Sequence, residues 1–217
     1  MSNHCEYIQF GCGICAPDGW ANYDAGPSFW LEKYLPLLKP FLIRKGFPNY
    51  PTERIQYGDI ITGLPVHEQS AKGIYCSHVL EHLTLDDFRS TLRNIFKYLE
   101  PGGCFRLVLP DLEYLARQYI ADPSPQAASR FLEASYLGEP HADHGISALL
   151  KSIFGRSRHL WMWDYKAIAH ELAFAGFVEI RRSSFNDSDD KRFLEVEELG
   201  RWENCLGVEC NRPGAVK

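Results

Sequence analysis

Short runs of apolar residues alternate with longer segments in which apolar residues recur at helical spacing. The short runs are strand-like in length and end in glycine or aspartate, which predicts parallel strands followed by turns. Five such strands are expected in the first half of the chain, at Tyr7–Phe10, Trp20–Tyr23, Arg54–Tyr57, Gly73–Cys76 and Cys104–Leu109. This alternation predicts an α/β fold, doubly wound, with a mostly parallel sheet covered by helices on both faces.

Three helices are expected between these strands and after them. The first is capped by Ser28 and runs to about Leu38, with Pro36 and Pro40 expected to break or kink it. The second begins at Leu85 and is stopped by EPGG, and the third is capped by Asp164 and ended by Gly176. Two further strands, at 177–185 and 206–210, follow without a helix of normal length between them. The last strand is therefore expected to run antiparallel, at or near the sheet edge.

The segment from Asp111 to about Leu160 is too long for an ordinary connection in such a sheet. It is expected to be a helical insertion that covers the substrate site. Because no linker or repeat divides the chain, residues 1–217 are interpreted as a single domain.

Composition and charge argue against nucleic-acid binding and against membrane insertion. With 217 residues, a formal charge of −5 and scattered Lys and Arg, the chain lacks the basic surface of a nucleic-acid-binding protein. No apolar run is long enough to span a membrane and no signal peptide is evident, so we expect a cytoplasmic protein without membrane insertion. The seven cysteines show no disulfide spacing and are expected to be reduced thiols.

Candidate ligand-binding residues stand where the expected strands end. Gly11 and Gly13 allow a sharp turn and close approach of a ligand to the backbone. Asp24 could accept hydrogen bonds from a ribose diol, and Asp59 could bind an adenine amino group. Taken singly, each is also what an ordinary turn after a strand contains.

The ordered set of motifs is more specific. FGCG, GWANYD, HVLEHL, LEPGG and FRLVLPDLE occur in this order between Tyr7 and Tyr119, and HLWMWDYKAIAHELAFAGF follows later. In these motifs the sequence resembles the class I S-adenosylmethionine-dependent methyltransferases, and among them a small bacterial group with GWxNxD and HVLEHL, similar to the type 11 methyltransferases.

The resemblance implies a Rossmann-like, seven-stranded sheet and S-adenosylmethionine as the cofactor. Gly11, Cys12 and Gly13 would lie beside its methionine part, Asp24 would hold the ribose, and Asp59 with Ile60 would frame the adenine. The cofactor-binding residues implied in this way are Phe10, Gly11, Cys12, Gly13, Asp24, Asp59, Ile60, Ser77 and His78.

Two departures from the class are visible. GCGICAPDG has Ile14 and Cys15 where a third glycine is usual, and Asp24 follows Gly13 by only 11 positions. The first crossover helix is therefore expected to be shortened or missing.

Histidines are the candidate catalytic residues, because a general base near neutral pH would assist methyl transfer to oxygen or nitrogen. The candidates are His78 and His82, predicted to share one helix face in HVLEHL, and His141 and His144 in the insertion. Structural roles remain the alternative for each: capping for His78, packing for His82, and a solvated loop for His141 and His144.

Two other patterns were weighed. His141-x-x-His144 has metal-ligand spacing but no evident further ligands, so no metal site is assigned. Cys12-Gly-Ile-Cys15 matches the redox pattern C-x-x-C, yet nothing downstream indicates a thioredoxin-like fold.

Aromatic residues gather in HLWMWDY, where Trp161, Trp163 and Tyr165 could line a substrate pocket or pack the following helix onto the sheet. Arg106 lies within an otherwise apolar strand and is expected to pair with an acid.

Together these features predict an S-adenosylmethionine-dependent methyltransferase that acts on a small-molecule acceptor, with a hydroxyl of a sugar or nucleotide sugar as the preferred example, as in polysaccharide biosynthesis. The alternative is a catalytically inactive binding or scaffold protein that keeps the fold. The oligomeric state is open, with a homodimer as one alternative.

Overall fold

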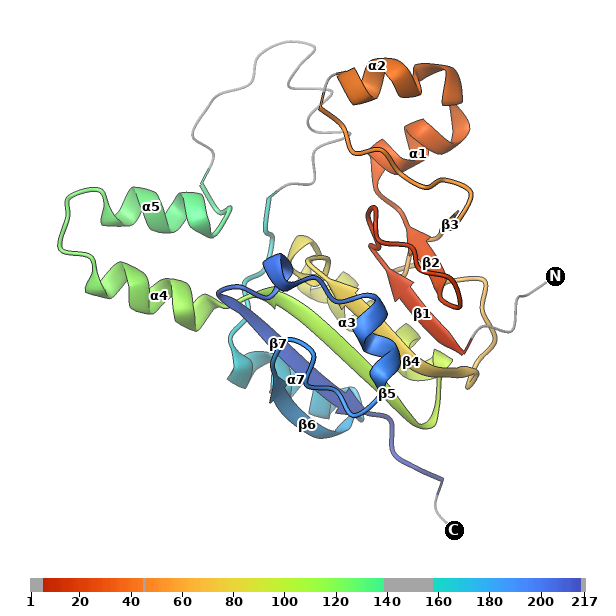
Figure 1. Cartoon of the computed structure of the whole chain (residues 1–217). Helices are drawn as coiled ribbons and strands as arrows, with labels where there is room; N and C mark the ends of the chain where they lie inside the picture. Colours follow the sequence, from red (N-terminus) through yellow and green to blue (C-terminus); the bar gives the residue numbers. More distant parts are fainter. Residues whose placement is uncertain (1–5, 45, 139–157, 216–217) are drawn as a thin grey trace.

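The computed structural model describes residues 6–44, 46–138 and 158–215. Its centre is a seven-stranded sheet with the order β3-β2-β1-β4-β5-β7-β6 (Figure 1). The strands are β1 (Tyr7–Phe10), β2 (Ala21–Asp24), β3 (Ile55–Tyr57), β4 (Ala71–Ser77), β5 (Leu99–Pro110), β6 (Val178–Ser183) and β7 (Cys205–Asn211). Only β7 runs antiparallel, between β5 and β6. The predicted Rossmann-like sheet is confirmed, including the antiparallel last strand near the edge.

Two of the helices, α3 (Leu85–Tyr98) and α7 (Tyr165–Phe174), pack on one face of the sheet, and short 3-10 turns pack on the other. The other helices are α1 (Pro27–Tyr34), α2 (Lys39–Arg44), α4 (Leu112–Ala121) and α5 (Ala127–Ala134). The 3-10 turns are η1 (Pro36–Leu38), η2 (Leu80–His82), η3 (Lys191–Glu195) and η4 (Leu199–Arg201).

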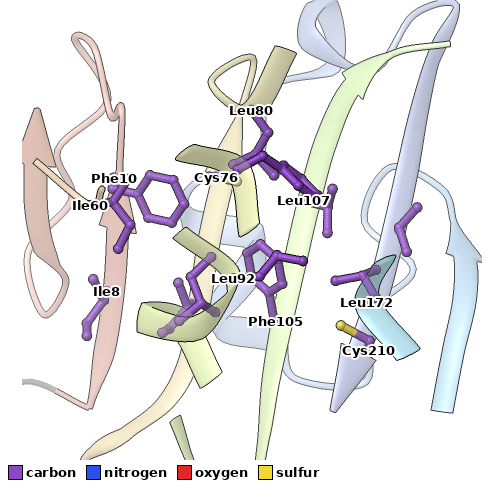
Figure 2. Close-up of a cluster of buried hydrophobic side chains, with 14 of the residues drawn as sticks. Ile8, Phe10, Ile60, Cys76, Leu80, Leu92, Phe105, Leu107, Leu172 and Cys210 are labelled. Atoms are coloured by element: carbon purple, nitrogen blue, oxygen red, sulfur yellow. The ribbon is translucent and has the colours of Figure 1, made fainter. Parts of the chain in front are cut away.

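The main core lies under α3 and α7. Phe88 and Leu92 of α3 and Leu172 of α7 pack against Ile8 and Phe105 of the sheet, all of them fully buried (Figure 2). A second cluster on the opposite face joins the sheet to η3 and η4 through Tyr75, Val108, Phe193 and Trp202. The sheet is thus buried on both sides, as its continuous apolar strands require.

Residues 11–20, all of which the structure describes, connect β1 to β2 without a helix. The missing crossover helix predicted from the short Gly13 to Asp24 spacing is therefore confirmed. The Gly11 to Gly13 turn and the end of β2 are separated by fewer residues than a connection containing a helix would need.

The predicted first helix was wrong in its cap and its length. Gly26 occupies the N-cap position and Pro27 the first helical position, while the Ser28 hydroxyl lies 3.0 Å from the Tyr50 hydroxyl. The helix ends at Tyr34 because Pro36 cannot continue it, and the chain starts again as η1 and α2. The predicted break at Pro36 is thus confirmed, and the range predicted as one helix holds α1 and η1.

The other two predicted helices are confirmed. Thr84 caps α3 by accepting a hydrogen bond from the Asp87 N–H, and Asp164 caps α7 by accepting one from the Ala167 N–H. After α3 the chain enters β5 directly, so EPGG belongs to the strand, which is longer than predicted. Leu99 pairs there with Ala71 of β4.

The segment after β5 carries α4 and α5, which extend away from the sheet (Figure 1). They confirm that the insertion is helical at its start. None of the helices in the described ranges is long and apolar enough to cross a membrane.

Arg106 of β5 pairs with acids, as predicted. Its side chain is 0% exposed and bonds Glu197, Asp187, Glu209 and the Ser184 carbonyl oxygen. We call Arg106 with these three carboxylates the Arg106 cluster. Asp187 lies in the loop between β6 and η3.

Candidate active site

The residues predicted to bind a ligand do meet at one edge of the sheet. Strands β1, β2, β3 and β4 are parallel neighbours, with Phe10 opposite Tyr23 and Cys76, and Asp24 opposite Tyr57. Their carboxyl ends therefore lie side by side. This edge is where ligands bind in open α/β sheets, next to the point where the strand order reverses between β1 and β4.

The turn after β1 is open on one side only. Gly11 and Gly13 both have positive φ, at +61° and +58°. A Cβ on Gly11 would lie 2.2 Å from Cγ2 of Val79, whereas a Cβ on Gly13 would have no atom within 4 Å. A ligand could therefore approach the turn along Gly13.

Asp24 holds this turn in place. The side chain is 7% exposed, and its two oxygens accept hydrogen bonds from the Gly13 N–H at 3.0 Å and the Gly26 N–H at 2.6 Å. Each carboxylate oxygen has a second lone pair available. Asp24 can thus anchor the turn and still accept a hydrogen bond from a ligand.

The remaining predicted cofactor residues are mostly buried. Asp59 is half-buried, and one of its oxygens accepts the Ile61 N–H at 2.9 Å. The others present mainly backbone to the edge because their side chains are buried: Phe10, Cys12, Ile60 and Ser77.

Arg201 was missed in the sequence. Together with Tyr50, Glu198 and residues of the glycine turn, it lines a cavity of about 170 Å³ beside Gly13. It belongs to η4, far along the chain from the turn. Because no motif surrounds it, nothing in the sequence distinguishes Arg201 from the other arginines.

His78 follows β4 directly and has φ of +55°. Its Nε2 lies 2.9 Å from the Arg201 carbonyl oxygen, and its Nδ1 lies 3.3 Å from Glu81 Oε1. Burial acts to lower the pKa of His78, but its contacts with the Cys205 thiol, the Glu81 carboxylate and the Arg201 carbonyl oxygen together raise the pKa to about 10. In this arrangement His78 keeps its proton near pH 7 and acts as a hydrogen-bond donor.

HVLEHL does not form the predicted helix. His78 and Val79 have non-helical backbone angles, and only Leu80–His82 turn, as the 3-10 segment η2. The expectation that His78 and His82 share one helix face was therefore wrong. His78 and His82 instead both lie near the carboxylate of Glu81, whose side chain is buried.

Glu81 is the centre of a histidine cluster. Its side chain is 1% exposed, and Oε1 lies 3.3 Å from His78 Nδ1, 4.0 Å from His82 Nε2 and 3.9 Å from His159 Nε2. We call Glu81 with these three histidines the Glu81 cluster. His159 is the first residue of HLWMWDY, and the sequence did not predict it as a site residue because it lies far along the chain from Glu81.

A cavity of about 700 Å³ opens beside the Glu81 cluster. One wall holds the Glu81 cluster, and the other walls come from α4, the end of α5 and the approach to β7. Polar side chains of the other walls include Tyr114, Glu203 and Asn204. The cavity is large enough for a small organic molecule.

Comparison with known proteins decides the family. The profile of a methyltransferase domain matches residues 7–181, which is most of the chain. The chain belongs to this methyltransferase-domain family. No curated protein matches it.

The solved structures that align with this chain are only distantly similar to it. A structure of PigF with SAH is 16% identical, with a TM-score of 0.47, and 95% of this chain aligns with 49% of that one. An S-adenosylmethionine-dependent methyltransferase from Archaeoglobus fulgidus is 14% identical, with a TM-score of 0.49 and coverage of 95% and 85%. Phosphoethanolamine N-methyltransferase 2 from Haemonchus contortus is 11% identical, with a TM-score of 0.47 and coverage of 98% and 50%. The chain spans about half the length of PigF.

Other predicted site residues of this methyltransferase domain are placed as follows. Cys12 and Cys15 have pKa values raised by burial, which makes both thiols poor nucleophiles and disfavours redox use. His141 and His144 lie outside the described residues.

The aromatic residues of HLWMWDY divide between packing and exposure. Trp163 is buried against Phe88, with ring centroids 4.3 Å apart, and Tyr165 donates a hydrogen bond to the Ile180 carbonyl oxygen. Trp161 is exposed. Two of the three thus hold the α7 region onto the sheet of the methyltransferase domain.

Proposed function

We propose that this chain is an S-adenosylmethionine-dependent methyltransferase that acts on a small-molecule acceptor in the 700 Å³ cavity. The observation that carries the proposal is the convergence of the glycine turn, Asp24 and Asp59 at one sheet edge, directly beside a cavity lined by His78. A nucleoside-bearing cofactor and its acceptor would then be neighbours, which methyl transfer requires.

The residues at the sheet edge fit such a cofactor. A Cβ on Gly13 would meet no atom within 4 Å, and Asp24 retains lone pairs for a ribose diol. Arg201 adds a positive charge beside Gly13, suited to the carboxylate of an amino acid. When bound, S-adenosylmethionine supplies a methyl group on a positively charged sulfur.

The protein's own residues would orient the acceptor. His78 lines the cavity, and its two ring nitrogens face the Arg201 carbonyl oxygen and the Glu81 carboxylate, so it fixes the shape of the wall. Tyr114, Glu203 and Asn204 supply polar contacts. This mixture suits a hydroxyl-rich acceptor such as a sugar or nucleotide sugar, which we propose as the substrate class.

A binding or scaffold protein without activity is the second candidate. Val79 closes the Gly11 side of the turn, and both Asp24 oxygens already accept backbone hydrogen bonds. If these contacts persist with ligand present, the edge would bind the cofactor weakly.

Calorimetric titration of S-adenosylmethionine into the purified chain tests the proposal. The Asp24→Asn variant should bind at least about tenfold more weakly, because it loses a charge-assisted acceptor. Asp18→Asn, on the exposed loop before β2, is the matched control and should bind as the unchanged protein does. Equal dissociation constants for Asp24→Asn and the unchanged protein would remove Asp24 from the site.

Transfer of a labelled methyl group to a panel of hydroxylated acceptors separates the two candidates. Product formation supports the enzyme. Tight cofactor binding without transfer to any member of a panel that includes sugars and nucleotide sugars would favour the binding protein.

A further inference from the structure

The Glu81 carboxylate is buried without the partners that a buried charge normally has. Among the residues that the structure describes, neither Glu81 oxygen accepts a hydrogen bond. Its neighbours are imidazole nitrogens, 3.3 Å away on His78 and 3.9 to 4.0 Å away on His159 and His82. A buried carboxylate costs several kcal/mol unless it is paired or bound to a metal ion. His78 is the nearest positive partner but makes no hydrogen bond to the carboxylate, so both Glu81 oxygens can still accept a further positive ligand.

His82 is oriented as a metal ligand would be. Its Nδ1 lies 3.0 Å from the Arg158 carbonyl oxygen, which places the proton on Nδ1. Nε2 then carries a lone pair and lies on the Glu81 side of the ring. Metal-binding histidines typically donate their other ring N–H to a carbonyl or carboxylate in this way.

Backbone hydrogen bonds hold the second histidine in place. The Glu81 carbonyl oxygen accepts the N–H groups of Leu160 at 2.7 Å and Trp161 at 3.2 Å. These bonds fix the strand containing His159 against η2, and the His82 and His159 rings meet edge to face, with centroids 5.0 Å apart. The ligand atoms of Glu81, His82 and His159 all lie within 4.8 Å of one another.

His78 is unsuited to join them. Its Nε2 is held by the Arg201 carbonyl oxygen and its Nδ1 faces Glu81. With both nitrogens engaged, it has no free lone pair and acts as a neighbour of the site.

We propose that Glu81, His82 and His159 bind a divalent transition-metal ion in the wall of the 700 Å³ cavity. Two imidazoles and one carboxylate favour zinc, iron, manganese or cobalt over magnesium, which prefers oxygen ligands. The donor atoms would have to close from about 4 Å to roughly 3.3 Å around a tetrahedral ion with metal–ligand bonds near 2.0–2.1 Å.

Three protein ligands leave at least one coordination position open toward the cavity. On the proposed function, one hydroxyl oxygen of the acceptor would occupy the open position and be held beside the cofactor. The metal site itself does not depend on that function, because its residues stand apart from Gly13 and Asp24.

Titration of Co²⁺ into tag-free, full-length, reduced protein tests the site by calorimetry and visible absorption. The unchanged protein should bind one equivalent with a spectrum of nitrogen and oxygen ligation. Glu81→Gln and His159→Ala should each weaken Co²⁺ binding by at least about tenfold. His170→Ala, on the exposed face of α7, is the matched control and should bind as the unchanged protein does.

Several results would overturn the site: Co²⁺ affinity within threefold in both variants, equal loss in the His170→Ala control, or a thiolate charge-transfer spectrum that assigns the ion to cysteines. Circular dichroism checks folding, and Glu81→Gln keeps the side-chain shape if His159→Ala fails to fold. S-adenosylmethionine titration of the same metal-free variants should be unchanged, which separates failure of the metal site from failure of the proposed function.

Discussion

Two buried ionic clusters in this molecule differ in how completely their charges are paired. In the Arg106 cluster the guanidinium makes four hydrogen bonds, to three carboxylates and a carbonyl oxygen. In the Glu81 cluster a carboxylate that is equally buried accepts no hydrogen bond among the described residues. Burial of charge is thus common to both, and only the pairing separates them.

The location of each cluster fits this difference. The Arg106 cluster ties β5 and β7 to the loop before η3, on the face that η3 and η4 cover. The Glu81 cluster lies in the wall of a cavity at the carboxyl edge of the sheet. A charge satisfied within the protein stabilises the fold, whereas a charge left unsatisfied at a cavity indicates a ligand.

The largest expected effect comes from Arg106→Met. Removal of the guanidinium leaves the buried Glu197 carboxylate without its cation, so we expect a loss of about 3–5 kcal/mol in the free energy of unfolding. Urea unfolding of the variant and the unchanged protein measures it. A loss below about 1 kcal/mol would mean that the Arg106 cluster is not structural.

The next effect is a loss of folding stability at acidic pH, through the protonation of Asp187. Partial burial acts to raise the pKa of Asp187, but Arg181, the Ser184 N–H and Arg106 lower it overall. Because the folded pKa lies below the unfolded value, the contribution of Asp187 is present above about pH 4 and is lost as the pH falls through the folded pKa.

Asp187→Asn should therefore be less stable than the unchanged protein at pH 7, with the difference shrinking below about pH 4. Unfolding curves at pH 7, 4 and 3 measure this difference. If the difference in free energy of unfolding between the two proteins stays constant with pH, Asp187 is not the titrating group.

A smaller effect is expected for Arg181→Gln. Arg181 bonds Asp187 and Glu209 from the half-exposed rim of the Arg106 cluster, where solvent screens the charges. The expected loss is roughly 0.2–1 kcal/mol. Thermal unfolding of Arg181→Gln and Arg106→Met under the same conditions measures the two losses of stability. Equal losses would show that the rim and the buried centre of the Arg106 cluster contribute alike.

The smallest effect should be that of Glu81→Gln on the metal-free protein. Loss of the contact with His78 and relief of the buried charge oppose each other, so stability should change by less than about 1 kcal/mol. Urea unfolding in the presence of a chelator measures this change. A loss as large as that of Arg106→Met would make Glu81 a structural residue and remove the contrast between the clusters.

Local features of the chain were predictable because they depend on neighbours in sequence. Thr84 and Asp164 cap helices through N–H groups three residues on, and Gly11 and Gly13 mark a turn at the end of β1. The first helix was mispredicted because Gly26 with Pro27 competes with Ser28 as a start signal. HVLEHL was mispredicted because its apolar spacing suits a helix, while packing of His78 against the end of β7 forces a positive φ.

The sequence by itself determined the alternation of strands and helices, the missing crossover helix, and the placing of Gly13, Asp24 and Asp59 at one edge. These follow from short-range patterns and the rule that parallel strands end on one side. Only the tertiary structure decided that His159 meets Glu81, that Arg201 meets the glycine turn, and that Arg106 meets three acids. Such contacts join segments far apart in the chain, and they depend on how side chains pack once the sheet has formed.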